Sequence, residues 1–143
     1  MKARANPYQE YQSNQIGTAD PRQLIVMLYD GAIRFLSLAE GYIENYKTFD
    51  KANHNILRAQ DILSELMVSL DFEKGGEIAQ NLFNLYAWMK KELIEANLEK
   101  KKEPLTKVIT MLADLKETWE RLEVPANYNT QSMASASGFV AEG

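Results

Sequence analysis

The stretch TADPRQLIVMLYDGAIRFL, from Thr18 to Leu36, predicts a helix with more apolar surface than one neighbour can cover. Asp20 suits the N-cap of this helix, and Pro21 suits its first helical position. Six consecutive apolar residues then run from Leu24 to Tyr29. Six positions span the whole circumference of an α-helix, whereas a helix of a small bundle needs one apolar stripe. The sequence therefore raises the question of what covers the other sides of this helix.

Three further segments outside this stretch repeat apolar residues every three or four positions, which is the spacing of an amphipathic helix. Asp50 is the expected N-cap of the second helix, and Gly75-Gly76 interrupts the pattern before the third. No segment shows the alternation typical of a strand. Because short connections make neighbouring helices antiparallel, we expect an all-α, antiparallel up-down four-helix bundle with helices at about 20–46, 50–70, 76–98 and 104–124.

The two ends of the chain differ in composition from the helical segments. Residues 1–19 are mostly polar and predict a mobile N-terminal arm. Residues 125–143 are small and polar, which is typical of a disordered tail. We therefore divide the chain into an arm, a bundle over residues 20–124 and a C-terminal tail.

Composition excludes several classes of protein. The 143 residues include no cysteine, so neither a disulfide framework nor a thiolate metal site can form. The net charge of −4 argues against a nucleic-acid binder, which normally has a basic surface. The longest apolar run is too short for a membrane span, and no apolar segment follows the basic residues at the N-terminus. We expect no nucleic-acid partner, no membrane insertion and no secretory signal.

The residues with catalytic potential are few. His54 is the single histidine, so the Glu-x-x-His pairs of di-iron bundles are missing, and no Gly-rich phosphate loop is present. We therefore predict no enzyme activity, no cofactor and no metal site. One alternative is histidine phosphotransfer, in which an exposed histidine on a four-helix bundle accepts a phosphoryl group beside a cation such as Arg58. The position of His54 near the start of its helix argues against this alternative.

Apolar residues that lie off the core stripes are the main functional signal. Helical-wheel positions place them on the flanks of the first three helices, whereas the fourth helix has a narrow stripe that predicts a core role for Trp119, Leu112 and Leu115. Apolar surface beyond the needs of a bundle marks an interaction site. The predicted partner-binding residues are Met27, Ile33, Leu57, Ile62, Val68, Phe83 and Ile94.

Several motifs, in order and at matching spacing, resemble the flagellin-specific export chaperones of the FliS family. The resemblance covers about residues 6–122. It includes the stretches NPYQEYQSNQIGTADPRQLIVMLYDGAIRFL and LDFEKGGEIAQNLFNLYAWMKKELIEAN, and the late Trp119. Asp20 stands where the family more often has Ser or Thr, a conservative change among capping residues. Within those stretches the matching positions are Tyr8, Tyr11, Thr18, Ala19, Pro21, 27–32, 74–77, 85–86 and 95–97.

The resemblance implies a cytoplasmic four-helix bundle that binds the disordered C-terminal segment of flagellin. Such a chaperone prevents premature polymerisation and delivers flagellin to an export-gate component of the flagellar type III apparatus. The resemblance also implies that the N-terminal arm, with Tyr8, Tyr11 and Ile16, covers the bundle until flagellin binds. A helix-in-groove mode of client binding would suit the surplus apolar surface. Assembly of the free protein as a homodimer stays open.

Overall fold

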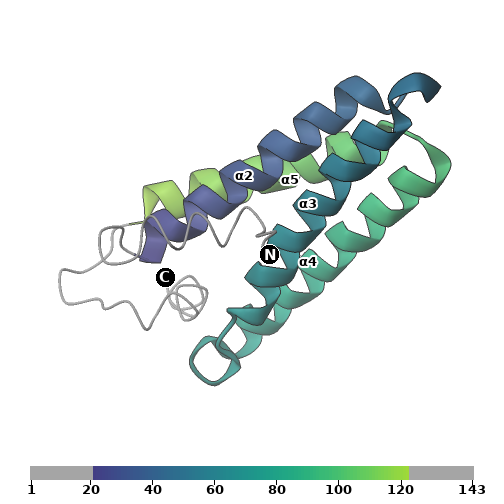
Figure 1. The fold of residues 1–143 in the computed structure, drawn as a ribbon. Helices are drawn as coiled ribbons and strands as arrows, with labels where there is room; N and C mark the ends of the chain where they lie inside the picture. Colours follow the sequence, from purple (N-terminus) through teal and green to yellow (C-terminus); the bar gives the residue numbers. More distant parts are fainter. Residues whose placement is uncertain (1–20, 123–143) are drawn as a thin grey trace, which may run out of the picture.

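The computed structural model describes residues 21–122, and every regular element in this range is helical (Figure 1). The predicted all-α class is confirmed. Asp20, the arm and the tail lie outside the described residues, so the division into three regions stays a prediction. The elements are α2 (Pro21–Tyr42), the short 3-10 helix η1 (Tyr46–Thr48), α3 (Phe49–Val68), α4 (Phe72–Glu99) and α5 (Glu103–Arg121).

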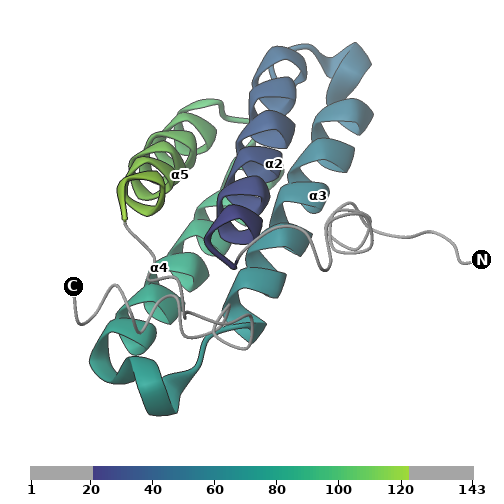
Figure 2. The same cartoon turned by 90° about the vertical axis from the view of Figure 1, so that its left-hand side faces the viewer.

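The four α-helices form the predicted antiparallel up-down bundle. Helix α2 packs against α3 and α5, while α4 closes the ring by packing against the same two helices. Successive helices run in opposite directions along the bundle (Figures 1 and 2). Each helix therefore has two neighbours, and its apolar surface has to serve both of them.

The apolar run Leu24–Tyr29 is covered in part by this arrangement. Its residues Ile25, Leu28 and Tyr29 are buried, and the other three are half-buried. Because α2 lies between α3 and α5, side chains from more than one side of the helix reach the core. Two neighbouring helices thus account for much of the wide apolar surface that the sequence predicts.

The core confirms the role predicted for α5. Trp119 and Leu112 are buried, and Leu115 is half-buried against the core cluster. The prediction for Ile62 as a partner-binding residue is wrong, because its side chain is fully buried. Helix α3 packs between α2 and α4, so its buried arc is wider than the single stripe assumed from the sequence.

The connection between α2 and α3 differs from the prediction. Helix α2 ends at Tyr42 rather than near Tyr46, and η1 follows, with the Asn45 side chain accepting a hydrogen bond from the Lys47 amide at 2.9 Å. Because η1 leads directly into α3, Asp50 lies in the first turn of α3 and is not its N-cap. A carboxylate in that turn still favours the helix through its dipole.

The start of α4 also differs from the prediction. The Asp71 carboxylate caps the helix by accepting hydrogen bonds from the amides of Glu73 and Lys74 at 3.0 and 3.1 Å. The helix therefore begins at Phe72, about one turn before the expected Gly76. Gly76 instead forms a kink inside α4, with φ 52° and ψ −127°. A residue without Cβ adopts this conformation at low cost, so the glycine pair permits a kink where the sequence suggested a helix start.

Candidate functional site on helices α3 and α4

Four of the predicted partner-binding residues lie at least partly exposed on the two adjacent helices α3 and α4. Leu57 and Val68 belong to α3, whereas Phe83 and Ile94 belong to α4. Phe72, the first residue of α4, adds a further exposed aromatic side chain. We call this set of five residues the α3–α4 face.

Two hydrogen bonds between α3 and α4 show which residues of the two helices lie opposite each other along the bundle. The Lys90 ammonium group donates to the Ser64 hydroxyl at 2.6 Å. Near the C-terminal end of α4, the Asn97 side-chain amide donates to the Asn53 side-chain oxygen, also at 2.6 Å. Both bonds join α4 to α3, so they define a seam between the helices on the surface of the molecule.

Leu57 and Ile94 lie beside this seam at the same level. Leu57 follows Asn53 by four residues, and Ile94 precedes Asn97 by three. In antiparallel helices both steps lead in the same direction, and steps of three or four residues stay on one side of a helix. The two side chains are 46% and 48% exposed. They therefore form an apolar pair that the bundle does not cover.

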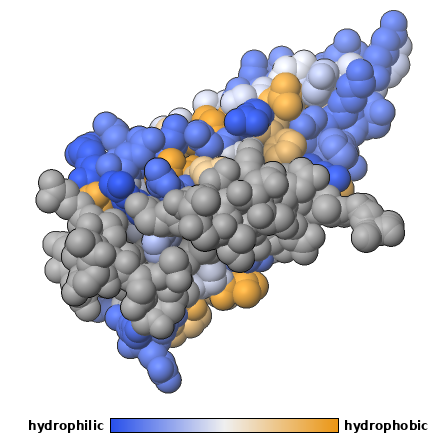
Figure 3. Space-filling view, turned by 60° about the vertical axis from the view of Figure 1, so that its left-hand side comes forward, coloured by the Kyte–Doolittle hydropathy of each residue, from blue (hydrophilic) through white to orange (hydrophobic). Residues whose placement is uncertain are grey.

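The other end of the α3–α4 face is aromatic. The rings of Phe72 and Phe83 pack edge to face, with centroids 5.8 Å apart. Val68, the last residue of α3, precedes this pair by one short turn and is 79% exposed. Figure 3 shows one side of the molecule, on which apolar surface forms separate patches among hydrophilic residues. The α3–α4 face has the same character, with apolar side chains at both ends and polar groups between them.

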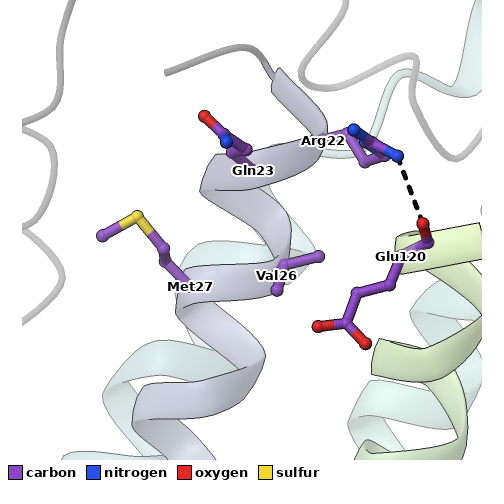
Figure 4. A pocket seen from close by; sticks show the side chains of 5 residues that line it. All are labelled: Arg22, Gln23, Val26, Met27 and Glu120. Atoms are coloured by element: carbon purple, nitrogen blue, oxygen red, sulfur yellow. Dashed lines mark hydrogen bonds between the residues drawn. The ribbon is translucent and has the colours of Figure 1, made fainter. Parts of the chain in front are cut away.

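Met27 lies away from this face, at a pocket near the start of α2. The pocket is lined by Arg22, Gln23, Val26 and Met27 of α2 and by Glu120 of α5 (Figure 4). Arg22 connects the two helices, since its guanidinium group donates to the backbone oxygen of Leu122 at 2.7 Å and to that of Glu120 at 3.2 Å. Figure 4 shows Met27 pointing away from α5, so its thioether lies on the outer side of the pocket.

The other predicted residues are placed differently. Ile33 on α2 is half-buried and packs against the core cluster. Ile62 belongs to the core and cannot contact a partner while the bundle is intact. The arm residues Tyr8, Tyr11 and Ile16 lie outside the described part of the chain. The structure thus brings together four of the seven candidates.

A buried aromatic cluster joins three helices through hydrogen bonds. The hydroxyl groups of Tyr29 and Tyr86 lie 2.6 Å apart, and the Trp119 indole donates to the Tyr29 hydroxyl at 3.1 Å. Burial raises the pKa of Tyr29 to about 12 and that of Tyr86 well above its ordinary value. Both phenols therefore stay protonated near neutral pH and serve as hydrogen-bonding groups between α2, α4 and α5.

His54 is exposed near the start of α3. No hydrogen bond or ion pair joins its imidazole ring to another side chain or to the backbone within 21–122. The same range holds no group of three or more His, Cys, Asp or Glu side chains that could bind a metal ion, and no helix long and apolar enough to cross a membrane. Nothing in this arrangement favours the phosphotransfer alternative.

Two residues of the site were missed by the sequence analysis. Phe72 was assigned to the break before the third helix, because the Asp71 cap was not recognised. Lys90 lies seven residues after Phe83 and four before Ile94, which places all three on one side of α4. This spacing could have identified Lys90, but the site was predicted from the helical-wheel positions of apolar residues alone.

Comparisons with known proteins agree with these features. The family model for the flagellar protein FliS matches residues 4–126. The flagellar secretion chaperone FliS of Bacillus subtilis is 33% identical over 116 residues, which cover 81% of this chain and 85% of that protein. Its counterpart from Campylobacter jejuni is 36% identical over 115 residues, which cover 80% of this chain and 89% of that protein. The flagellar secretion chaperone FliS of Salmonella typhimurium is 35% identical over 111 residues, which cover 78% of this chain and 82% of that protein. The chain belongs to the FliS family, whose curated relatives are flagellar secretion chaperones.

Proposed function

We propose that this chain is a cytoplasmic, non-enzymatic export chaperone for flagellin. It binds the disordered C-terminal segment of newly made flagellin, prevents premature polymerisation and presents the client to an export-gate component of the flagellar type III apparatus. Family membership supports the chaperone role. The observation that carries client binding is the α3–α4 face, where apolar side chains from two helices stay exposed.

The physical reason for such a face is the nature of the client. A disordered segment that later packs as an amphipathic helix has an apolar stripe that needs cover before assembly. An exposed apolar surface between two helices offers that cover. Coupled folding and binding buries roughly 1,000–3,000 Å² and loses several kcal/mol to ordering of the segment. The net affinity is then moderate, which suits a carrier that has to release its client.

Titration calorimetry with the full chain and a flagellin C-terminal peptide tests the proposal. The unaltered protein should bind the peptide. Leu57→Glu and Ile94→Glu should each weaken binding more than tenfold, because burial of such a side chain contributes about 1.5–3 kcal/mol. Circular dichroism should show intact helices in both variants, since both side chains are about half exposed in the free bundle.

Two control variants sharpen this experiment. Leu38→Glu makes the same kind of change at a similarly exposed position on α2, a helix that contributes no residue to the α3–α4 face, and should bind nearly as well as the unaltered protein. His54→Gln should also bind normally. Failure of the unaltered chain to bind the flagellin peptide would overturn the proposed function. If Leu38→Glu and Leu57→Glu lowered the affinity for the peptide equally, binding would not depend on this face.

A further inference from the structure

Lys90 has an unusual position on the α3–α4 face. Lys90 is half-buried and lies between the apolar residues Phe83 and Ile94 along one side of α4. Its ammonium group donates a hydrogen bond to the neutral hydroxyl of Ser64 across the seam. Within residues 21–122, no carboxylate forms an ion pair with Lys90. By contrast, Lys107 pairs with Glu92 at 3.3 Å and Lys116 with Asp30 at 2.8 Å.

A helix that covers this face would change the surroundings of the ammonium group. An ammonium group has three hydrogen atoms to donate, and the Ser64 hydroxyl accepts one of them. Water can accept the others while the face is open. A bound apolar helix would displace that water and leave a charge poorly solvated, unless the helix supplied an anion. A carboxylate is the protein group that meets this need with a charge-assisted hydrogen bond.

We propose that Lys90 selects clients that carry an Asp or Glu at the centre of the bound helix. This inference rests on the proposed function and specifies the chemistry of the client. A client helix on the α3–α4 face places apolar residues against Phe83 and Ile94 and a carboxylate against Lys90. A helix with apolar residues alone buries an unpaired ammonium group and is rejected for that reason.

The spacing along α4 defines the client pattern. Lys90 lies seven residues from Phe83 and four from Ile94, or about 10 Å and 6 Å at the helical rise of 1.5 Å per residue. A client helix parallel to α4 therefore carries an apolar residue, an acidic residue seven positions later and a second apolar residue four positions after that. An antiparallel helix carries the same pattern in reverse. In both cases the carboxylate is nearer to the residue that meets Ile94.

Calorimetry with single-substitution peptides tests this assignment. The probes are the flagellin C-terminal peptide and a set in which each Asp or Glu is replaced in turn by Asn or Gln. One replacement should weaken binding to the unaltered protein about tenfold, the size expected for a hydrogen bond to a charged group. Lys90→Met keeps the aliphatic length but removes the charge, so it should bind the original peptide with the same reduced affinity. The peptide that lacks the sensitive carboxylate should bind Lys90→Met no more weakly than the original peptide does.

A charge swap and a matched control complete the experiment. Lys90→Glu should bind the original peptide poorly and recover affinity for a peptide with Lys at the sensitive position. Lys91→Met changes the exposed neighbouring lysine and should bind all peptides as the unaltered protein does. Normal binding by Lys90→Met, or no single carboxylate that affects the unaltered protein, overturns this inference and leaves the proposed function intact. No binding by the unaltered protein overturns both.

Discussion

Helix α5 and the α3–α4 face use similar apolar side chains in opposite ways. Within residues 21–122, none of the large exposed apolar side chains lies on α5, whose larger apolar side chains are buried or packed against the core. Helices α3 and α4 bury comparable stripes but also expose Leu57 and Ile94. Helix α5 has two neighbours as well, so contact with two neighbours does not require exposed apolar residues. The exposed apolar side chains on α3 and α4 therefore indicate a surface that has a binding role besides packing of the bundle.

The largest expected effect separates the two regions by stability. Trp119→Ala should lower the free energy of unfolding by about 3–5 kcal/mol, because a large buried side chain leaves a cavity. The substitution also removes the hydrogen bond to Tyr29. Urea unfolding followed by circular dichroism measures the loss. A Trp119→Ala protein that folded with normal stability and yet lost the flagellin peptide would place α5 in the binding surface and break the comparison.

Alkaline pH should weaken the aromatic cluster that joins α5 to the core. Burial raises the pKa of Tyr29 from 10 to about 12, so the unfolded chain releases this proton at a lower pH than the folded protein. The contribution of Tyr29 is therefore complete below pH 10 and is lost as the pH rises towards 12. At about 1.4 kcal/mol per pH unit, it amounts to roughly 3 kcal/mol.

Urea unfolding at several pH values between 8 and about 11.5 checks this loss of stability. The double variant Tyr29→Phe and Tyr86→Phe should lose less stability over the same interval, because both phenols with raised pKa values are gone. A pH dependence equal to that of the unaltered protein would show that the cluster does not cause the loss. The charge variants on the α3–α4 face should keep the pH dependence of the unaltered protein.

Removal of residues 1–17 should raise the affinity for the flagellin peptide several-fold. If the arm and the client compete for one surface, docking of the arm lowers the apparent affinity by the fraction of open molecules. The deleted protein should also self-associate more readily, because apolar surface is uncovered. Calorimetry and analytical ultracentrifugation measure the two effects. Weaker binding by a folded deletion variant would instead make the arm part of the client-binding site.

The smallest effect is expected for the C-terminal tail. Truncation after Val124 should change the free energy of unfolding by less than about 1 kcal/mol, since changes away from packed residues usually have small effects. Thermal unfolding of the truncated and full chains measures the difference. A large drop in melting temperature would mean that the tail packs on the bundle, and Phe139 would be the first residue to examine by substitution.

The sequence by itself determined the helices and their arrangement. Apolar spacing of three and four residues and short connections predict an antiparallel bundle, because an amphipathic helix has to bury its stripe against neighbours. The same spacing identified Leu57, Val68, Phe83 and Ile94 as apolar residues off the core stripes. The predicted helix ends differ from the observed ones, since η1 and the kink at Gly76 depend on local hydrogen bonds and backbone angles.

The tertiary structure decided which of these residues can act together. Ile62 shares its helix with Leu57, but the packing of α3 against two neighbours buries the first and leaves the second exposed. The relative shift of α4 along α3 determines that Leu57 lies opposite Ile94 and that Lys90 contacts Ser64. Helical periodicity determines the direction of a side chain from its own axis. The relative shift and rotation of two packed helices depend on side-chain packing across the whole core.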